Sequence, residues 1–409
     1  MYKHILKIGF LNLFRRKSRS FSVIIMIAFG VSMLMFTQGI YEGMVKQMFN
    51  DAIRTGAGQI EICKKGFYES QLLSDYIHDP AAVEKILKSN QAVWAYTYRL
   101  KADGLVSSSK YSQGVKVIGI NSENEKHFIN YKKPVISGSF DLPERKAIIG
   151  YRLADKLKVK VGKKIVVNGQ ALDKELAASV FRISGIIRTN NPEIDDAAVI
   201  INLSEMQYLL KITGVSEFNL LVKNEKLLPQ IMQALNSEFS LKVKQRLDVI
   251  PWQKIYSLFV MMDSMMDYFI YISYFIVFMA VAVGFFNIML ISVLERVREF
   301  GILIALGTSF RLISIMIFFE AFFIGFIGFL VGSIFGFLIL LYCSIYGLNL
   351  SFFSEGLNSF GMSAILFTDI KIGYFVLAFV AVFITTLCSI IIPIYKLRKL
   401  RPVEAIRFV

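Results

Sequence analysis

Cysteine and histidine are scarce in this chain of 409 residues, which has three of each. The cysteines, Cys63, Cys343 and Cys388, are odd in number and widely spaced, so neither a disulfide framework nor a zinc site is indicated. The histidines are scattered and form no HExxH pair, so we do not expect a metalloenzyme. No metal site is predicted.

Nucleotide-binding and hydrolase motifs are also missing. The sequence contains no GxSxG, no GxGxxG and no GxxxxGK[ST], and Gly162-Lys163-Lys164 lacks the upstream glycine and the hydroxyl residue of a phosphate loop. We therefore expect no catalytic residue and no cofactor bound by this chain. ATP-driven work would need a separate ATPase subunit that holds ATP and Mg²⁺.

Charge is sparse too. Charged residues make up 19% of the chain and hydrophobic residues 55%, which is too apolar for an ordinary soluble protein. The net charge of +15 is typical of a membrane protein that keeps lysine and arginine on its cytoplasmic side and near anionic lipid. Nucleic acid is not an expected partner, because no basic and aromatic binding module is visible.

What the chain does have is four long apolar runs. They are Phe21–Tyr41, Tyr268–Leu294, Leu312–Ile345 and Ile372–Tyr395, and Glu320 in the third is their only charged residue. About 20 apolar residues cross the hydrocarbon core, so each run predicts a transmembrane helix. The first is too long for the core of a cleaved signal peptide, and no convincing cleavage site follows it.

The basic clusters predict the orientation of these spans in the membrane. Residues 1–20 are rich in lysine and arginine and form either an amphipathic helix on the cytoplasmic surface or a simple flank. With four spans, both termini lie in the cytoplasm, including the basic tail 396–409. Residues 42–267 are then extracytoplasmic, and residues 268–395 form a three-span unit in the cytoplasmic membrane.

The extracytoplasmic segment mixes strand and helix patterns, which predicts an α+β domain beside the α-helical spans. Strands are expected at Gly58–Ile62, Val115–Ile120, Lys163–Val167, Val180–Ile187 and Ala198–Asn202. Helices are expected at Pro80–Ser89, Glu144–Leu157, Leu203–Ile212 and Leu227–Glu238.

A short charged and amphipathic segment, 295–311, connects the second and third spans on the predicted cytoplasmic side. Its charged residues offer ion pairs to a soluble subunit, its apolar residues offer a knob, and Gly307 offers a turn. The coupling residues that we predict are Glu295, Arg296, Arg298, Glu299, Gly301, Ile302, Leu303, Ala305 and Gly307.

Within the third span, Gly328, Gly332 and Gly336 repeat every four residues and form one smooth face for close helix packing. The partner of this face is either another helix of the same chain or a second subunit. Glu320 is an intramembrane acid and so a functional candidate, although a structural or hinge role fits it better.

Several segments together carry a resemblance to a known family. The segments are Asn12–Lys17, Thr55–Ile62 with Lys65-Gly66-Phe67, Val180–Asn202, Glu295–Gly307 and Arg401–Arg407. They resemble the MacB/FtsX-like permeases of ABC transporters, nearest the lipoprotein-releasing LolC/LolE group. Gln59 stands where the family usually has histidine.

The resemblance implies a MacB-like periplasmic core domain, an FtsX-like permease domain and a coupling helix at 295–311. It also implies a dimer of permease chains, identical or different, on a pair of LolD-like ATPase subunits. Motion of the ATPases would pass through the membrane by mechanotransmission. The substrate would be a lipoprotein handed to a soluble periplasmic carrier, although the loop 168–179 lacks the proline-rich character of the docking loop.

In the lipoprotein-releasing group, acyl chains enter a cavity lined by the first two spans. Flexible methionine side chains suit such a lining. The candidates here are Met33, Phe36, Ile40, Met44, Met48, Met262, Met265, Met266 and Phe269. The expected function is ATP-driven extraction of lipoproteins from the outer leaflet of the cytoplasmic membrane. The alternatives are a MacB-like efflux permease and an FtsX-like regulator of an extracytoplasmic enzyme.

Overall fold

The computed structural model describes residues 17–128, 135–189, 191–353, 356–357 and 362–399. The chain divides into two compact units. A membrane unit contains residues up to Val45, Asp263–Leu350 and the chain from Ile365 onward, and a sheet unit contains Lys46–Met262 and Ser351–Ala364. Residues 1–16 of the predicted N-terminal helix at 1–20 and residues 400–409 of the tail 396–409 lie outside the described residues, and Lys17–Ser20 belong to the first long helix.

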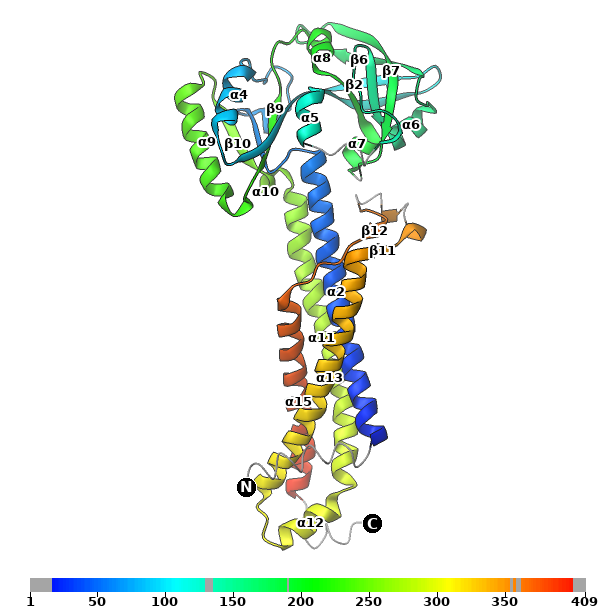
Figure 1. Ribbon diagram of the computed structural model, residues 1–409, viewed down its shortest axis with the longest axis vertical. Coiled ribbons are helices and arrows are strands. Elements are labelled where there is room, and N and C mark those ends of the chain that lie inside the picture. The colour runs from blue at the N-terminus through cyan, green and yellow to red at the C-terminus, as the bar shows by residue number, and fades with distance from the viewer. Residues whose placement is uncertain (1–16, 129–134, 190, 354–355, 358–361, 400–409) are drawn as a thin grey trace. The chain divides into compact units, whose positions relative to one another are not determined.

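Four helices are long and apolar enough to cross a membrane. They are α2 (Lys17–Thr55), α11 (Ser257–Leu294), α13 (Phe310–Tyr346) and α15 (Ile372–Lys399). Each of the four predicted spans falls within one of them, and α2 and α11 continue well beyond the predicted spans. The short helix α12 (Val297–Ala305) connects α11 to α13 (Figure 1).

The three predicted packing glycines of α13, Gly328, Gly332 and Gly336, pack against α2 of the same chain. A Cβ at Gly328 would lie 2.8 Å from the Ile27 Cβ, and a Cβ at Gly332 would lie 2.6 Å from the Ala28 carbonyl oxygen. The Ser32 hydroxyl donates to the Gly332 carbonyl at 2.8 Å. The sequence left open whether this glycine face packs against a helix of the same chain or against a second subunit. In the structure it packs against a helix of the same chain.

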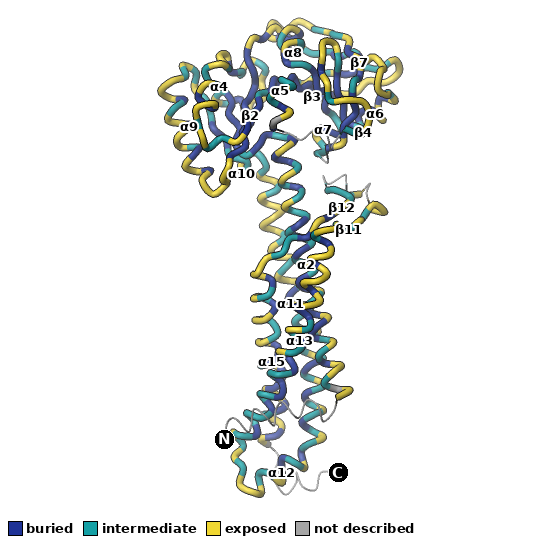
Figure 2. The backbone as a smooth tube through the Cα atoms, viewed as in Figure 1, coloured by how far each residue is buried: buried dark blue, intermediate teal, exposed yellow. Residues whose placement is uncertain are grey.

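The span helices expose much of their apolar surface, as Figure 2 shows along α11 and α15. Their inner faces share one core with residues such as Met35, Phe285 and Tyr374. Apolar side chains are stable in contact with lipid, so span helices can pack tightly against one another and still keep an apolar outer surface.

The sheet unit is built on one mixed sheet of ten strands. The strand order is β10-β1-β9-β2-β3-β8-β5-β7-β4, with β6 paired to β2 and β7. The strands are β1 (Ile60–Lys64), β2 (Val93–Ser107), β3 (Ser112–Ile120), β4 (Val135–Gly138), β5 (Lys146–Gly150), β6 (Lys164–Gln170), β7 (Leu176–Ile187), β8 (Ala198–Asn202), β9 (Glu217–Val222) and β10 (Leu247–Pro251).

Helices cover this sheet, and side-chain caps fix where several of them begin. They are α4 (Pro80–Ser89), α5 (Ser122–Phe128), α6 (Tyr151–Leu157), α7 (Pro192–Ala197), α8 (Leu203–Leu210), α9 (Leu228–Lys242) and α10 (Trp252–Ile255), with a single turn, α3 (Phe67–Ser70). Asp79 caps α4, where Pro80 fits the first turn because its missing N–H is not needed there.

One predicted element of this unit is wrong. The segment Glu144–Leu157 is not one helix, because Lys146–Gly150 forms strand β5 and only Tyr151–Leu157 is helical. Ala147, Ile148 and Ile149 are all fully buried between β7 and β8, and a continuous apolar run of this length fits a central strand. The other predicted helices and strands each overlap an observed one.

Candidate functional site

The predicted coupling segment contains a helix with two distinct faces. Arg298, Ile302, Ala305 and Leu306 are exposed and lie within about 100° of one another around the axis of α12. Leu306 is 77% exposed and Ile302 45%. Val297 and Phe300 are buried on the other side, in the core of the membrane unit, and Gly301 is buried between the two faces. The helix thus presents a stripe with one charge and three apolar side chains.

Arg296 attaches this helix to the third span. Its Nη1 donates to Glu320 Oε2 of α13 at 2.9 Å, and its Nε donates to Glu299 Oε2 at 3.2 Å. The guanidinium also lies over the Phe300 ring, 5.1 Å from its centroid. Of the predicted coupling residues, Arg296 and Glu299 therefore belong to this internal brace. Glu320, whose role the sequence left open, is its third member.

Gly307 ends α12 in a left-handed conformation with φ of +88°. The Thr308 N–H donates to the Leu303 carbonyl at 2.9 Å and the Gly307 N–H donates to the Ile304 carbonyl at 3.0 Å. This pair of bonds is a Schellman motif, which requires a left-handed residue at the position that Gly307 occupies. The turn before α13 thus depends on this glycine. Glu295, another predicted coupling residue, is exposed just before α12.

The predicted acyl-chain residues differ in their accessibility. Met33, Met262, Met265 and Phe269 are exposed by 39–58%, Phe36, Ile40, Met44 and Met266 are half-buried, and Met48 is only 7% exposed. Met33 and Phe269 belong to the membrane unit, whereas Met48 and Met262 belong to the sheet unit. The structure therefore removes Met48 from the set of open lining residues and leaves the others accessible.

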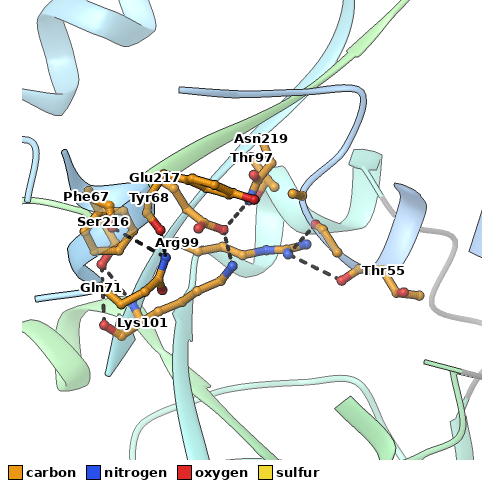
Figure 3. A network of polar contacts seen from close by, with 12 residues as sticks. Thr55, Phe67, Tyr68, Gln71, Thr97, Arg99, Lys101, Ser216, Glu217 and Asn219 are labelled. Atoms are coloured by element: carbon orange, nitrogen blue, oxygen red, sulfur yellow. Dashed lines mark hydrogen bonds and ion pairs between the residues drawn. The ribbon is translucent and has the colours of Figure 1, made fainter. Parts of the chain in front are cut away.

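A cluster of buried charges in the sheet unit was not predicted from the sequence. Arg99 on β2 donates from Nη2 to Glu125 Oε1 at 2.5 Å, and Lys101 on the same strand pairs with Glu217 Oε1 at 2.6 Å. Figure 3 shows Arg99 pointing toward Thr55 and Lys101 reaching Glu217. The available signal was weak: two basic residues interrupt an apolar strand, but their partners are far away in sequence.

Glu61 completes this cluster. Burial, together with the charge of Glu217, raises the pKa of Glu61 to about 8. Burial alone would raise the pKa of Glu217 as well, but Lys101 and Arg99 lower it below its usual value. Glu61 is the cross-strand neighbour of Asn219, whose buried Oδ1 has no hydrogen-bond partner among the described residues. A protonated Glu61 is thus the form that suits this site.

The described residues offer no other chemistry of an obvious kind. Among them, no group of three or more His, Cys, Asp or Glu side chains could hold a metal ion. Cys63 and Cys343 are buried free thiols, and Cys388 is an exposed one.

Comparison with known families gives two matches along this chain. Residues 20–238, more than half of the chain, match the MacB-like periplasmic core domain. Residues 271–402 match the FtsX-like permease C-terminal domain, which includes the brace and the exposed stripe of α12.

A curated relative is the lipoprotein-releasing system transmembrane protein LolC of Buchnera aphidicola subsp. Schizaphis graminum (strain Sg), 33% identical over 93 residues. That match covers 21% of this chain and spans 23% of the length of LolC.

Two solved structures are similar to the chain. The extracellular domain of the noncanonic ABC-type transporter YknZ from Gram-positive bacteria is 14% identical with a TM-score of 0.34, and the match covers 47% of this chain and 98% of that one. The periplasmic region of MacB from Actinobacillus actinomycetemcomitans is 12% identical with a TM-score of 0.35, and the match covers 49% and 91%.

The two family matches agree with the architecture: a sheet unit that follows the first of four candidate spans, and three further span helices with a short helix between two of them. They indicate an inner-membrane protein with an extracytoplasmic domain. The family consists of transporter permeases, which are generally non-catalytic. The chain therefore belongs to the MacB/FtsX/LolC-type family of ABC transporter permeases.

Proposed function

We propose that this chain is the permease subunit of an ATP-driven complex that extracts lipoproteins from the outer leaflet of the cytoplasmic membrane. Membership of an ABC permease family implies an ATPase partner and a second permease chain. The observation that favours lipoproteins is the 33% identity to LolC over 93 residues. In this proposal the lipoprotein passes to a soluble periplasmic carrier.

The exposed stripe of α12 is the proposed docking face for the ATPase. Ile302, Ala305 and Leu306 supply apolar area that a soluble partner can cover, and Arg298 supplies a charge beside it. The opposite face is tied to α13 through Arg296 and Glu320. A push on the stripe would therefore reach the third span through an ion pair and packed side chains. ATP and Mg²⁺ remain on the partner.

The accessible residues near the outer ends of α2 and α11 are the proposed acyl-chain contacts. α11 is the least covered of the four span helices, with 17% of its most apolar window buried. Met265 and Phe269 lie one turn apart on it, so they share a face and are exposed by 49% and 58%. Flexible thioether and aromatic side chains on an uncovered apolar face suit a lipid chain.

Photocrosslinking tests this face directly. A photoreactive phenylalanine analogue at Phe269 should capture a radiolabelled triacylated lipoprotein in purified complex without ATP. The matched control is Tyr271, which is 65% exposed but points about 160° away from Phe269 around α11. Equal capture at both positions, or none at Phe269, would contradict the proposed lining.

Depletion in cells tests the function as a whole. When the chain is depleted, lipoproteins destined for the outer membrane should accumulate in the cytoplasmic membrane fraction. If they leave at the normal rate while export of a peptide or drug falls, the MacB-like efflux function replaces the proposal.

A further inference from the structure

The C-terminal end of α2 lies inside the sheet unit, and side chains from other elements hold it there. A helix end leaves carbonyl groups without intrahelical partners and carries partial negative charge. Here the carbonyls of Thr55 and Gly56 accept from a buried arginine of β2. The Ala52 carbonyl, which also accepts from the Gly56 N–H, accepts from a tyrosine that immediately precedes α11. These contacts are all among residues of one compact unit.

Arg99 provides the first contact. Its Nη1 donates to the Gly56 carbonyl at 2.6 Å and to the Thr55 carbonyl at 3.4 Å. The same guanidinium pairs with Glu125 of α5 and lies over the Phe128 ring, 5.7 Å from its centroid. Arg99 is 3% exposed and Glu125 is fully buried. The end of α2 is thus bound by a cation whose other side is fixed by a buried carboxylate.

Tyr256 provides the second contact. Its hydroxyl donates to the Ala52 carbonyl at 2.9 Å, one turn before the end of α2, and accepts from the Ala57 N–H at 2.9 Å. Helix α11 begins at the next residue, Ser257. One hydroxyl therefore joins the end of the first long helix to the start of the second.

The fit around this end leaves little room for movement. A Cβ at Gly56 would lie 2.0 Å from the Tyr256 hydroxyl oxygen and 2.7 Å from the Ala52 carbonyl oxygen. The Thr55 hydroxyl donates to the Asp51 carbonyl at 2.6 Å and accepts from Asn191 Nδ2 at 3.2 Å. The polar groups that a helix end would otherwise offer to water are satisfied by protein.

We propose that Arg99, Glu125 and Tyr256 form a helix-end clamp that fixes the C-terminal turns of α2 within the sheet unit. These three residues position the end of α2. This inference deepens the proposed function, because motion that enters at α12 can act on a lipoprotein outside only if α2 does not swivel where it meets the sheet unit. The helix is continuous from Lys17 to Thr55, and the clamp holds the part of it that belongs to the sheet unit.

A distance measurement on the full chain in lipid nanodiscs tests the clamp. Spin labels are placed at Phe29→Cys on α2 and Lys85→Cys on α4, both exposed positions, with the exposed Cys388 replaced by Ser. Phe29 is 26 residues from Thr55, about 39 Å along the helix, so a small swivel gives a large change in distance. We expect one narrow distance distribution in the unsubstituted chain.

Tyr256→Phe should broaden this distribution at least twofold. Arg99→Lys should broaden it further, since lysine keeps the positive charge but cannot bind Glu125 and the Gly56 carbonyl through two separate nitrogens. The matched control is Tyr68→Phe, because the Tyr68 hydroxyl also donates to a backbone carbonyl, that of Lys254 at 3.0 Å, away from α2. The control should keep the narrow distribution with a similar loss in thermal unfolding midpoint.

Equal widths for Tyr256→Phe and Tyr68→Phe overturn the clamp, whether both are narrow or both are broad. If Arg99→Lys does not fold, Tyr256→Phe decides alone. The measurement contains neither ATP nor lipoprotein, so it separates a failure of the clamp from a failure of the proposed function.

Discussion

Each of the two units holds the end of a helix with an arginine that is paired to a carboxylate, but the surroundings differ. Arg99 and Glu125 have side chains exposed by 4% and 1%, whereas Arg296 and Glu320 are exposed by 14% and 11%, and the second partner of Arg296, Glu299, by 43%. A more buried pair costs more to break, because the remaining charge cannot reach water. The sheet-unit pair is therefore the more costly of the two to break, and the membrane-unit brace, in which Glu299 is partly exposed, is the less costly.

The largest expected effect is at the sheet-unit pair. Arg99→Met removes the cation that pairs with the buried Glu125 carboxyl group, which should cost about 3–5 kcal/mol of local stability. Hydrogen exchange of the β2 amides in the full chain measures this loss. The double change Arg99→Met with Glu125→Leu should recover a large part of it. A loss below about 1 kcal/mol would remove the contrast with the membrane unit.

The next effect is a pH dependence confined to the sheet unit. The folded pKa of Glu61, about 8, lies above its ordinary value of 4.5. Between these values the folded protein binds a proton that the unfolded chain has lost, so stability should fall as pH rises through this range. Because Glu217 has a lowered pKa, it titrates below this range.

Thermal unfolding of the full chain at pH 5, 6.5 and 8 measures this dependence. Glu61→Gln, which mimics the protonated acid, should flatten it. If the unfolding midpoint of the Glu61→Gln chain changes with pH as steeply as that of the unsubstituted chain, another group is responsible for the pH dependence.

Arg296→Met should cost less stability than Arg99→Met, about 1–2 kcal/mol, because one of its two partners, Glu299, is 43% exposed and is screened by water. Its larger consequence should be functional: ATP hydrolysis by the complex continues while ATP-dependent substrate release falls. Measuring both rates on one preparation checks this. A variant that loses hydrolysis and release in equal proportion would show a docking defect in place of a broken brace.

The smallest expected effect is at the end of α12. Gly307→Ala places a side chain in the left-handed conformation of a Schellman motif, at a cost of about 1 kcal/mol. Gly373→Ala is the control, since a Cβ there meets nothing within 4 Å and φ is not positive. Circular dichroism thermal scans of the two variants should differ by a few degrees. Equal midpoints would mean that the turn tolerates alanine.

The helices of the membrane unit were well predicted because a span can be recognised from the local composition of the chain alone. Each long apolar run predicted a span, and each falls within a helix that is long and apolar enough to cross a membrane. The same reasoning located Gly328, Gly332 and Gly336 on one face. It could not name their partner, since the approach of Ile27 and Ala28 depends on helix packing across some 300 residues of chain.

The sheet unit was less predictable for a related reason. The run around Ile148 and Ile149 is equally apolar in a buried helix and a central strand, and only its neighbours β7 and β8 decide. No strand was predicted around Arg99, and nothing local pointed to Glu125 or to the end of α2. The continuation of α2 was visible in principle, because no proline occurs in Phe21–Thr55 and the helix ends just before Gly56.

Release of lipoprotein from reconstituted membranes tests the central claim most directly. The purified complex, in proteoliposomes with a triacylated lipoprotein and a carrier, should release the lipoprotein only with ATP. Leu306→Asp on the exposed stripe should abolish release, and Tyr208→Asp, at an 89% exposed position on α8, should not. ATP hydrolysis without any release of lipoprotein, or full release by the Leu306→Asp complex, would contradict the account.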